Sequence, residues 1–169
     1  MKLNLGCGKH RLDGFVNVDL TGSDQDVDLS VFPWPWEDGT VEEIVASHVL
    51  EHFSKEGGRT FIEECHRVLS EGGVLHIAVP DMDKFINAHL TGDFSPLKGY
   101  KWTDLNHLCG GDETEHNPAQ RHKYMYSFES LAYTLDNEGF PTVWYLAFPR
   151  DCDNLDYEAI SLYVTAVKL

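Results

Sequence analysis

The sequence predicts one domain built around an open, largely parallel α/β sheet. Short apolar segments bounded by Gly, Pro and Asp alternate with longer segments whose apolar residues recur at helical spacing. The chain has 169 residues, which is the usual length of a single domain and enough to bury a core without disulfide bonds. Strands that alternate with helices are typical of a sheet that helices cover on at least one face.

Four strands are expected in the first part of the chain. They lie at residues 3–5, 15–19, 26–29 and 43–47. The segment at 26–29 has the weakest strand pattern of the four. Residues 33–39 contain two prolines and a glycine, so we expect a loop there. Residues 6–14 are too few for a full crossover helix, and the first connection should therefore be short.

The second part alternates helices and strands, giving the order β-β-β-β-α-β-α-α-β-β. Residues 58–70 predict a helix with one apolar face, which the pair Gly72-Gly73 is expected to end. Ser127 predicts the start of a further helix that closes at Gly139. The remaining elements are a strand at 74–79, a helix at 82–90 and strands at 143–148 and 159–167. Residues 92–126 follow neither period and are interpreted as a long irregular segment.

The charge balance excludes some partners. The chain has 13 basic and 28 acidic residues and a formal net charge of −15, which disfavours a nucleic-acid substrate. No apolar run reaches the ~20 residues of a membrane span, and the first residues lack the profile of a signal peptide. The four cysteines form no CxxC pair, which favours free thiols. We expect a cytoplasmic protein, and its composition leaves the oligomeric state open.

The first strand runs into a Gly-x-Gly turn, Gly6-Cys7-Gly8. Glycines at such a turn allow positive φ and a close approach of a ligand to the backbone. Thirteen residues after Gly6, Asp19 ends the second expected strand, and a carboxylate there can accept both hydroxyls of a ribose. A tight turn without a ligand is the alternative for the glycines alone. The third glycine of a dinucleotide fingerprint is missing, because position 11 is an arginine.

Four blocks of the sequence carry a family resemblance: LNLGCG, VNVDL, SHVLEHF and HRVLSEGGVLHIAVPD. With these blocks the chain resembles the class I S-adenosylmethionine-dependent methyltransferases, and among them compact members with a shortened first helix. The resemblance implies a Rossmann-like, doubly wound sheet of six or seven strands whose last strand is antiparallel. It also implies methyl transfer from S-adenosyl-L-methionine to an O or N atom of a small acceptor, a class that includes sugars and cell-surface precursors. S-adenosyl-L-homocysteine would be the product.

The same resemblance assigns the cofactor site. The methionine part of the cofactor would lie over the Gly6-Cys7-Gly8 turn, the ribose at Asp19, and the adenine at Asp28 and Leu29. Further cofactor contacts are expected at Asn4, Leu20, Ser47 and His48. Asn4 and His10 stand where many members carry an acid and a third glycine. This departure keeps an alternative open, a non-catalytic subunit or regulator that binds S-adenosylmethionine or S-adenosylhomocysteine.

A methyl transfer needs a general base only when the acceptor is a hydroxyl or a protonated amine. Histidine suits that role near neutral pH. The candidates are His122, His107 and His48, and for each the alternative is a structural imidazole or a solvated loop residue. His122 is favoured, because the neighbouring Arg121 and Lys123 would disfavour its charged form. Two of these histidines lie in the irregular segment 92–126, which is interpreted as a lid over the acceptor.

Histidines and a cysteine also gather in that segment. His107, Cys109, His116 and His122 lie within sixteen residues, a set that could hold zinc in an interaction module. Their spacing matches no standard ligand pattern. The sequence therefore predicts no metal site.

Overall fold

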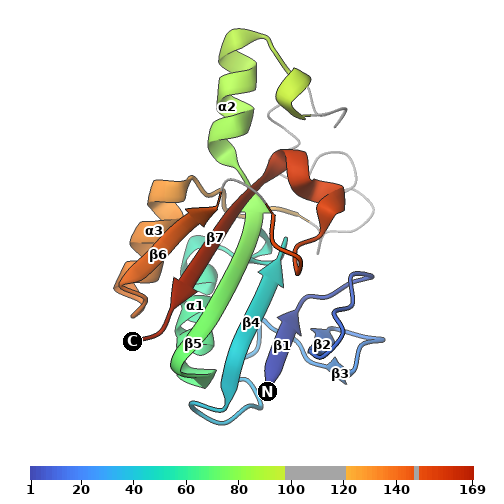
Figure 1. Ribbon diagram of the computed structural model, residues 1–169, viewed down its shortest axis with the longest axis vertical. Coiled ribbons are helices and arrows are strands. Elements are labelled where there is room, and N and C mark those ends of the chain that lie inside the picture. The colour runs from blue at the N-terminus through green and yellow to red at the C-terminus, as the bar shows by residue number, and fades with distance from the viewer. Residues whose placement is uncertain (98–120, 147–148) are drawn as a thin grey trace.

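The computed structural model describes residues 1–97, 121–146 and 149–169. Seven strands form a single sheet in the order β3-β2-β1-β4-β5-β7-β6 (Figure 1). Strand β7 pairs antiparallel with β5 and β6, and the other neighbours in the sheet pair parallel. The expected Rossmann-like sheet with an antiparallel last strand is confirmed.

The elements follow the expected order. The strands are β1 Lys2–Leu5, β2 Val16–Asp19, β3 Gln25–Asp26, β4 Val41–Ser47, β5 Leu69–Pro80, β6 Thr142–Leu146 and β7 Ser161–Val167. The α-helices are α1 Lys55–Val68, α2 Met82–Thr91 and α3 Phe128–Asn137, and short 3₁₀-helices are η1 Leu50–His52, η2 Ser95–Leu97 and η6 Leu155–Ile160. None of the helices in the described ranges is long and apolar enough to cross a membrane.

Two expected boundaries were wrong. The helix α1 stops at Val68, and Leu69 already belongs to β5, where it pairs with Val41. The Gly72-Gly73 pair lies inside this long strand, beside a shift in the β4–β5 register, because Gly72 takes a φ of 76° that lets the strand bulge. Strand β3 is also shorter than the expected 26–29 and ends at Asp26.

Helices α1 and α3 lie on one face of the sheet (Figure 1). Alternate side chains of the central strands point into the core beneath them, because the side chains of a strand alternate between its two faces. Leu5, Ile44, Ile77 and Val164 belong to this core and are each fully buried. Trp34, from the loop between β3 and β4, packs edge-on against Phe61 of α1 and extends the core past the helix.

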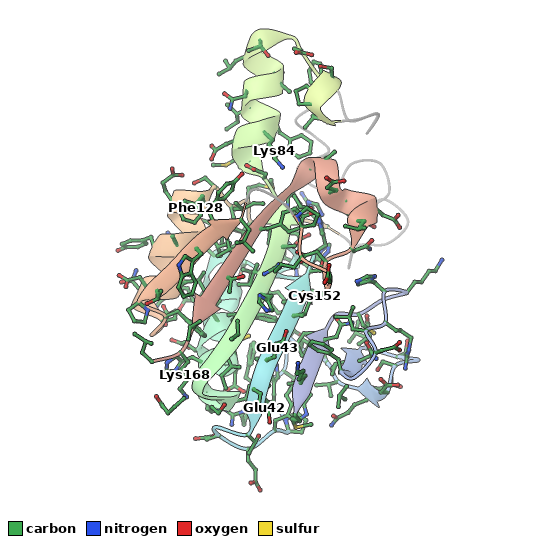
Figure 2. All side chains as sticks on the ribbon, viewed as in Figure 1. Glu42, Glu43, Lys84, Phe128, Cys152 and Lys168 are labelled. Atoms are coloured by element: carbon green, nitrogen blue, oxygen red, sulfur yellow. The ribbon has the colours of Figure 1, made fainter. Side chains whose placement is uncertain are left out.

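The opposite face carries no α-helix within the described ranges (Figure 1). Figure 2 labels Glu43 on this side of the sheet. The imidazole of His76 lies between Glu43 and Thr165, with Nε2 3.3 Å from the carboxylate and Nδ1 3.0 Å from the hydroxyl. Arg150 donates to the same hydroxyl and pairs at 2.6 Å with the buried Asp153. Residues of the β6–β7 connection therefore cover part of this face with paired polar groups.

The buried imidazole of His76 makes the stability of the fold depend on pH. Burial and the nearby Arg150 lower the pKa of His76 to about 4, whereas a histidine in an unfolded chain titrates near 6.5. Between these values the unfolded state binds more protons, so the free energy of unfolding should decrease as the pH falls from 6.5 to 4. We expect His76→Gln, which has no group that titrates there, to reduce this loss in urea denaturation at a series of pH values.

The matched control is His89→Gln, which changes an exposed histidine of α2. This variant should follow the wild-type dependence on pH. A His76→Gln protein that kept the full wild-type loss would show that His76 is not its source.

Candidate functional site

The glycine turn directly follows β1 and lies close to the segment that follows β4. Gly6 has a φ of 63°, and a Cβ atom built on it would come within 2.3 Å of Cγ2 of Val49. Gly8 also has a positive φ, of 50°, but a Cβ there would meet no atom within 4 Å. Gly6 thus allows the carboxyl ends of β1 and β4 to approach each other, while the space beside Gly8 is open to a ligand.

Asp19 lies beside the glycine turn at the end of β2. Its Oδ2 accepts a hydrogen bond from the N–H of Gly8 at 2.7 Å, and its Oδ1 accepts one from the N–H of Leu20 at 2.7 Å. Each oxygen of a carboxylate keeps a second lone pair, so the side chain can still accept bonds from two neighbouring hydroxyls. The side chain of Leu20 is exposed next to it. The structure brings Gly8 and Asp19 together, as a ribose site requires.

Asn4 is buried below the turn. Its Nδ2 donates to the carbonyl of His10 at 2.8 Å and to Oδ1 of Asn17 at 2.9 Å. These two bonds use both N–H groups of the amide. Asn4 therefore ties the loop after β1 to β2.

The two residues expected at the adenine lie in different surroundings. Asp28 is exposed, and its Oδ1 accepts bonds from the backbone N–H and the hydroxyl of Ser30, which lower the pKa of the Asp28 carboxyl. Leu29 is buried in the core, and its carbonyl accepts a bond from Nε1 of Trp34. Asp28 is accessible to a ligand in this arrangement, whereas the side chain of Leu29 packs into the protein.

His48 follows Ser47 at the end of β4, and both ring nitrogens of His48 contact polar groups. Nε2 lies 2.7 Å from Oγ of Ser161. That hydroxyl donates its only proton to the carbonyl of Tyr157, so Nε2 must be the donor to Ser161. Nδ1 lies 3.2 Å from Oε1 of Glu51. With both nitrogens placed in this way, neither faces open space from which an acceptor could approach.

The sequence analysis missed Glu51. It lies in η1 with 1% of its surface exposed, and neither carboxylate oxygen accepts a hydrogen bond, in good geometry, from a described residue. The imidazoles of His48, His52 and His122 surround it. Burial raises the pKa of the Glu51 carboxyl, but these three imidazoles lower it more, and the net pKa lies below its usual value. The quoted block SHVLEHF contained this residue, but the burial of its carboxylate depends on residues far along the chain.

His122 reaches the cluster because the chain that carries it is bonded to η1. The backbone N–H groups of Lys123 and Tyr124 donate to the carbonyl of Glu51 at 2.7 and 3.3 Å. One ligand atom from each of Glu51, His52 and His122 lies within 4.8 Å of the others. Of the other candidates in the expected lid, His107, Cys109 and His116 lie outside the described residues.

The described ends of segment 92–126 flank the sheet edge near this cluster. Tyr126 forms a parallel bridge with Asp81, which follows β5 and caps α2. Burial raises the pKa of the Asp81 carboxyl. Residues 98–120, which form most of the expected lid, lie outside the described part of the chain.

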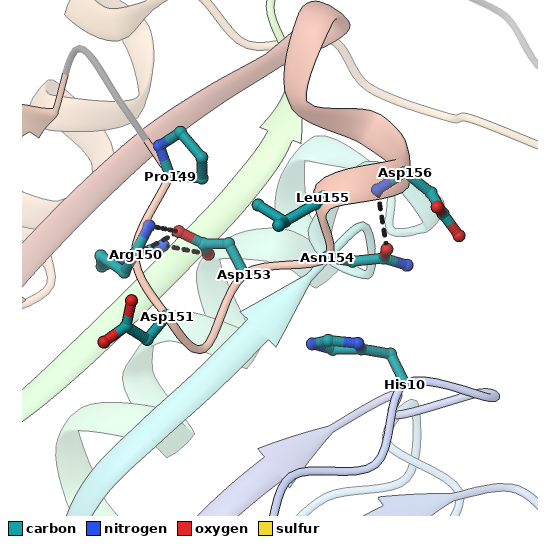
Figure 3. A pocket seen from close by; sticks show the side chains of 8 residues that line it. All are labelled: His10, Pro149, Arg150, Asp151, Asp153, Asn154, Leu155 and Asp156. Carbon is teal, nitrogen blue, oxygen red and sulfur yellow. Dashed lines mark hydrogen bonds and ion pairs between the residues drawn. The ribbon is translucent and has the colours of Figure 1, made fainter.

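A cavity of about 510 Å³ opens on the side of the sheet that carries the β6–β7 connection (Figure 3). It is lined by His10, Pro149, Arg150, Asp151, Asp153, Asn154, Leu155 and Asp156. Nε2 of His10 lies 3.2 Å from the carbonyl of Cys152, which joins the loop after β1 to this connection. The cavity therefore adjoins the glycine loop but is lined by none of the residues expected to bind the cofactor.

The close packing of Gly6 predicts a strong effect of a single methyl group. Gly6→Ala would add left-handed backbone strain and overlap with Val49, and it should lower the free energy of unfolding by about 2–5 kcal/mol. Gly8→Ala has the strain without the overlap and should cost about 1–2 kcal/mol. Chemical denaturation measures both values, and Gly6→Ala/Val49→Ala should recover part of the loss. Equal losses for Gly6→Ala and Gly8→Ala would contradict the packing argument.

The position of Asp19 predicts a loss of cofactor affinity when its carboxylate is removed. Asp19→Ala should weaken binding of S-adenosylhomocysteine by about 1.5–3 kcal/mol, the scale of hydrogen bonds to a charged group, and Asp19→Asn should weaken it less. Isothermal titration calorimetry on folded protein measures this change. The control is Asp26→Ala, since Asp26 is an exposed carboxylate bonded to Ser23 at the next strand end. Unchanged affinity in Asp19→Ala would remove Asp19 from the site.

Comparison with known proteins agrees with the fold. A family model described as a methyltransferase domain matches residues 20–77. A solved S-adenosylmethionine-dependent methyltransferase from Archaeoglobus fulgidus is 15% identical, with 99% of this chain and 85% of that chain covered and a TM-score of 0.61. A possible histamine N-methyltransferase from Thermotoga maritima is 12% identical, with 99% and 82% covered and a TM-score of 0.59.

A third solved structure is the 1,6-didemethyltoxoflavin-N1-methyltransferase of Burkholderia thailandensis with bound 1,6-didemethyltoxoflavin and S-adenosylhomocysteine. It is 16% identical, with 99% of this chain and 70% of that chain covered and a TM-score of 0.58. No curated protein matches the sequence. Residues 20–77 are thus similar to a methyltransferase domain, and the chain shares the fold of these solved methyltransferases.

Proposed function

We propose that this protein is an S-adenosylmethionine-dependent methyltransferase that acts on an oxygen or nitrogen atom of a small acceptor bound beside Glu51, His52 and His122. The observation that carries the proposal is the buried carboxylate of Glu51 with two imidazoles beside it, directly after β4. Strand β4 is the neighbour of β1, which leads into the glycine turn. The expected methyl donor and this polar cluster therefore belong to adjacent strand ends.

The cofactor side needs little chemistry from the protein. The sulfonium of S-adenosylmethionine is already activated, so the protein has to align the methyl group with the acceptor and exclude water. The open space beside Gly8 and the placement of the Asp19 carboxylate support binding of the nucleoside there. Asp28 is exposed in the next loop, and of the two residues expected at the adenine it is the one that we propose as a contact.

The acceptor side must handle a proton when the acceptor is a hydroxyl or an ammonium group. His48 is poorly placed for this, because its ring nitrogens face Ser161 and Glu51. Among the described histidines named from the sequence, His122 is then the candidate that acts on the acceptor. Small acceptors also agree with the names of two structural neighbours, a possible histamine N-methyltransferase and a 1,6-didemethyltoxoflavin-N1-methyltransferase. Sugars and cell-surface precursors also remain among the proposed acceptors, because the family resemblance of the four sequence blocks implies them.

Replacing His122 should separate turnover from cofactor binding. His122→Ala should reduce turnover by roughly 10²–10⁴, the usual effect of losing a group that handles a proton, with little change in the affinity for S-adenosylhomocysteine. Turnover is measured as S-adenosylhomocysteine formed with a panel of hydroxyl, amine and sugar acceptors. His89→Ala changes an exposed histidine of α2 and should leave turnover unchanged.

The panel also tests the proposal itself. Cofactor binding without turnover on any acceptor of the panel would favour a non-catalytic binding subunit. Wild-type turnover in His122→Ala would place the acceptor away from this cluster.

A further inference from the structure

We propose that Glu51, His52 and His122 bind one divalent first-row transition-metal ion. Their ligand atoms lie within 4.8 Å of one another, and since donors ~2.1 Å from a shared ion are at most ~4.2 Å apart, a small shift of the side chains would bring all three onto one ion. The three residues come from two segments, η1 and the chain just before α3. This inference deepens the proposed function. Only its last step, the role of the ion toward the acceptor, rests on that function.

The carboxylate of Glu51 is the strongest sign of a ligand. An ionised carboxylate that is fully buried without hydrogen bonds costs several kcal/mol unless a positive charge or donor compensates it. No described residue donates a hydrogen bond in good geometry to either of its oxygens. Nδ1 of His48 lies 3.2 Å from Oε1. A cation held between the carboxylate and the imidazoles of His52 and His122 would place a full positive charge beside this carboxylate.

The second ligand, His52, has a carbonyl beside one of its ring nitrogens. Nδ1 lies 3.4 Å from the backbone carbonyl of Arg121. When Nδ1 carries the ring proton, it points to this carbonyl, and Nε2 keeps a lone pair for an ion. Histidines that bind metals commonly donate their other N–H to a carbonyl or carboxylate in this way.

The third ligand, His122, is held in place by backbone bonds. The N–H groups of Lys123 and Tyr124 donate to the carbonyl of Glu51, and the rings of His52 and His122 meet edge-on with centroids 5.1 Å apart. The three ligands are therefore brought together by the fold. A site formed in advance loses less conformational entropy when it binds an ion.

The donor set selects the kind of ion. Two imidazoles and one carboxylate suit zinc and its first-row neighbours, whereas magnesium prefers oxygen donors and retains its waters. Three protein ligands leave at least one position of a tetrahedral ion open. An oxygen of the acceptor could fill that position, and the ion would then lower the pKa of the bound hydroxyl, so that with an ion bound His122 acts on the acceptor through the ion and does not take the proton itself. The formal net charge of −15 also favours the approach of cations.

This site differs from the zinc set weighed in the sequence analysis. That set contained His122 with three residues that lie outside the described part of the chain. The present set shares His122 but takes its other two ligands from the block SHVLEHF.

The test is metal binding by the full chain, with no need for an acceptor. Protein freed of metal with a chelator and dialysed is titrated with Zn²⁺ by calorimetry and with Co²⁺ by visible absorption, and Mg²⁺ serves as the comparison. We expect one equivalent of Zn²⁺ or Co²⁺ and much weaker binding of Mg²⁺. Glu51→Gln, His52→Ala and His122→Ala should each weaken binding by roughly 100-fold or more, since even residues that only orient a ligand contribute 10–100-fold.

The control is His66→Ala, which changes a half-buried histidine of α1 that packs against Phe140. It should bind the ion as the wild type does. Because Glu51 is buried, circular dichroism is used to check that each variant folds. If Glu51→Gln does not fold, His52→Ala still tests the site, since His52 is only half-buried. Absence of stoichiometric binding by the wild type, or binding that survives the three substitutions in folded protein, would overturn the proposal.

Turnover separates this inference from the proposed function. Metal binding without turnover on the acceptor panel leaves the metal site standing and refutes the function. Full turnover by metal-free protein refutes the role of the ion toward the acceptor and leaves the function standing.

Discussion

The close approach of Gly6 to Val49 determines where the functional groups of this protein lie. The loop after β1 could not pass under the segment after β4 if position 6 carried a Cβ atom. With glycine there, the two strand ends meet, and each contributes a different kind of group. The loop after β1 presents the backbone that holds Asp19, and the segment after β4 presents His48 and Glu51. The proposed donor and acceptor sites thus lie at the ends of two paired strands.

The short connections between the first strands leave one face of the sheet without a covering helix in the described part of the chain, and the β6–β7 connection covers part of that face. Within residues 1–54, all of which are described, no α-helix separates the strands, so α1 and α3 cover only one face. The uncovered face still contains polar groups such as His76 that are largely removed from water. Arg150 compensates them by bonding to Thr165, to the carbonyl of Val164 and to Asp153. The β6–β7 connection thus covers part of this face of the sheet through hydrogen bonds, whereas a helix would cover it through apolar packing.

Local signals in the sequence were enough to predict the order of the elements and the glycine turn, whereas contacts between distant residues explain what the sequence analysis missed. The Gly6-Cys7-Gly8 turn and Asp19 carry their own conformational and chemical signatures, and the structure brings them together. The end of α1 was wrong because a glycine pair that usually ends a helix lies here in a strand bulge, which only pairing with β4 reveals. Strand β3 ends at Asp26, and the side chain of Leu29 beyond it packs into the core. Glu51 was missed because residues 121–124, far along the chain, complete its surroundings.

His48 and Glu51 connect the two halves of the site. His48 has a φ of 56°, a left-handed conformation that costs a residue with a side chain about 1–3 kcal/mol and persists only where the surroundings enforce it. Its contacts with Ser161 and Glu51 provide that enforcement, since each ring nitrogen faces a polar partner. The imidazole is therefore fixed between β7 and η1, and one edge of the Glu51 carboxylate faces it. A ligand of the Glu51 carboxylate must therefore approach from the side of His52 and His122, where the chain that leads into α3 is bonded to the carbonyl of Glu51.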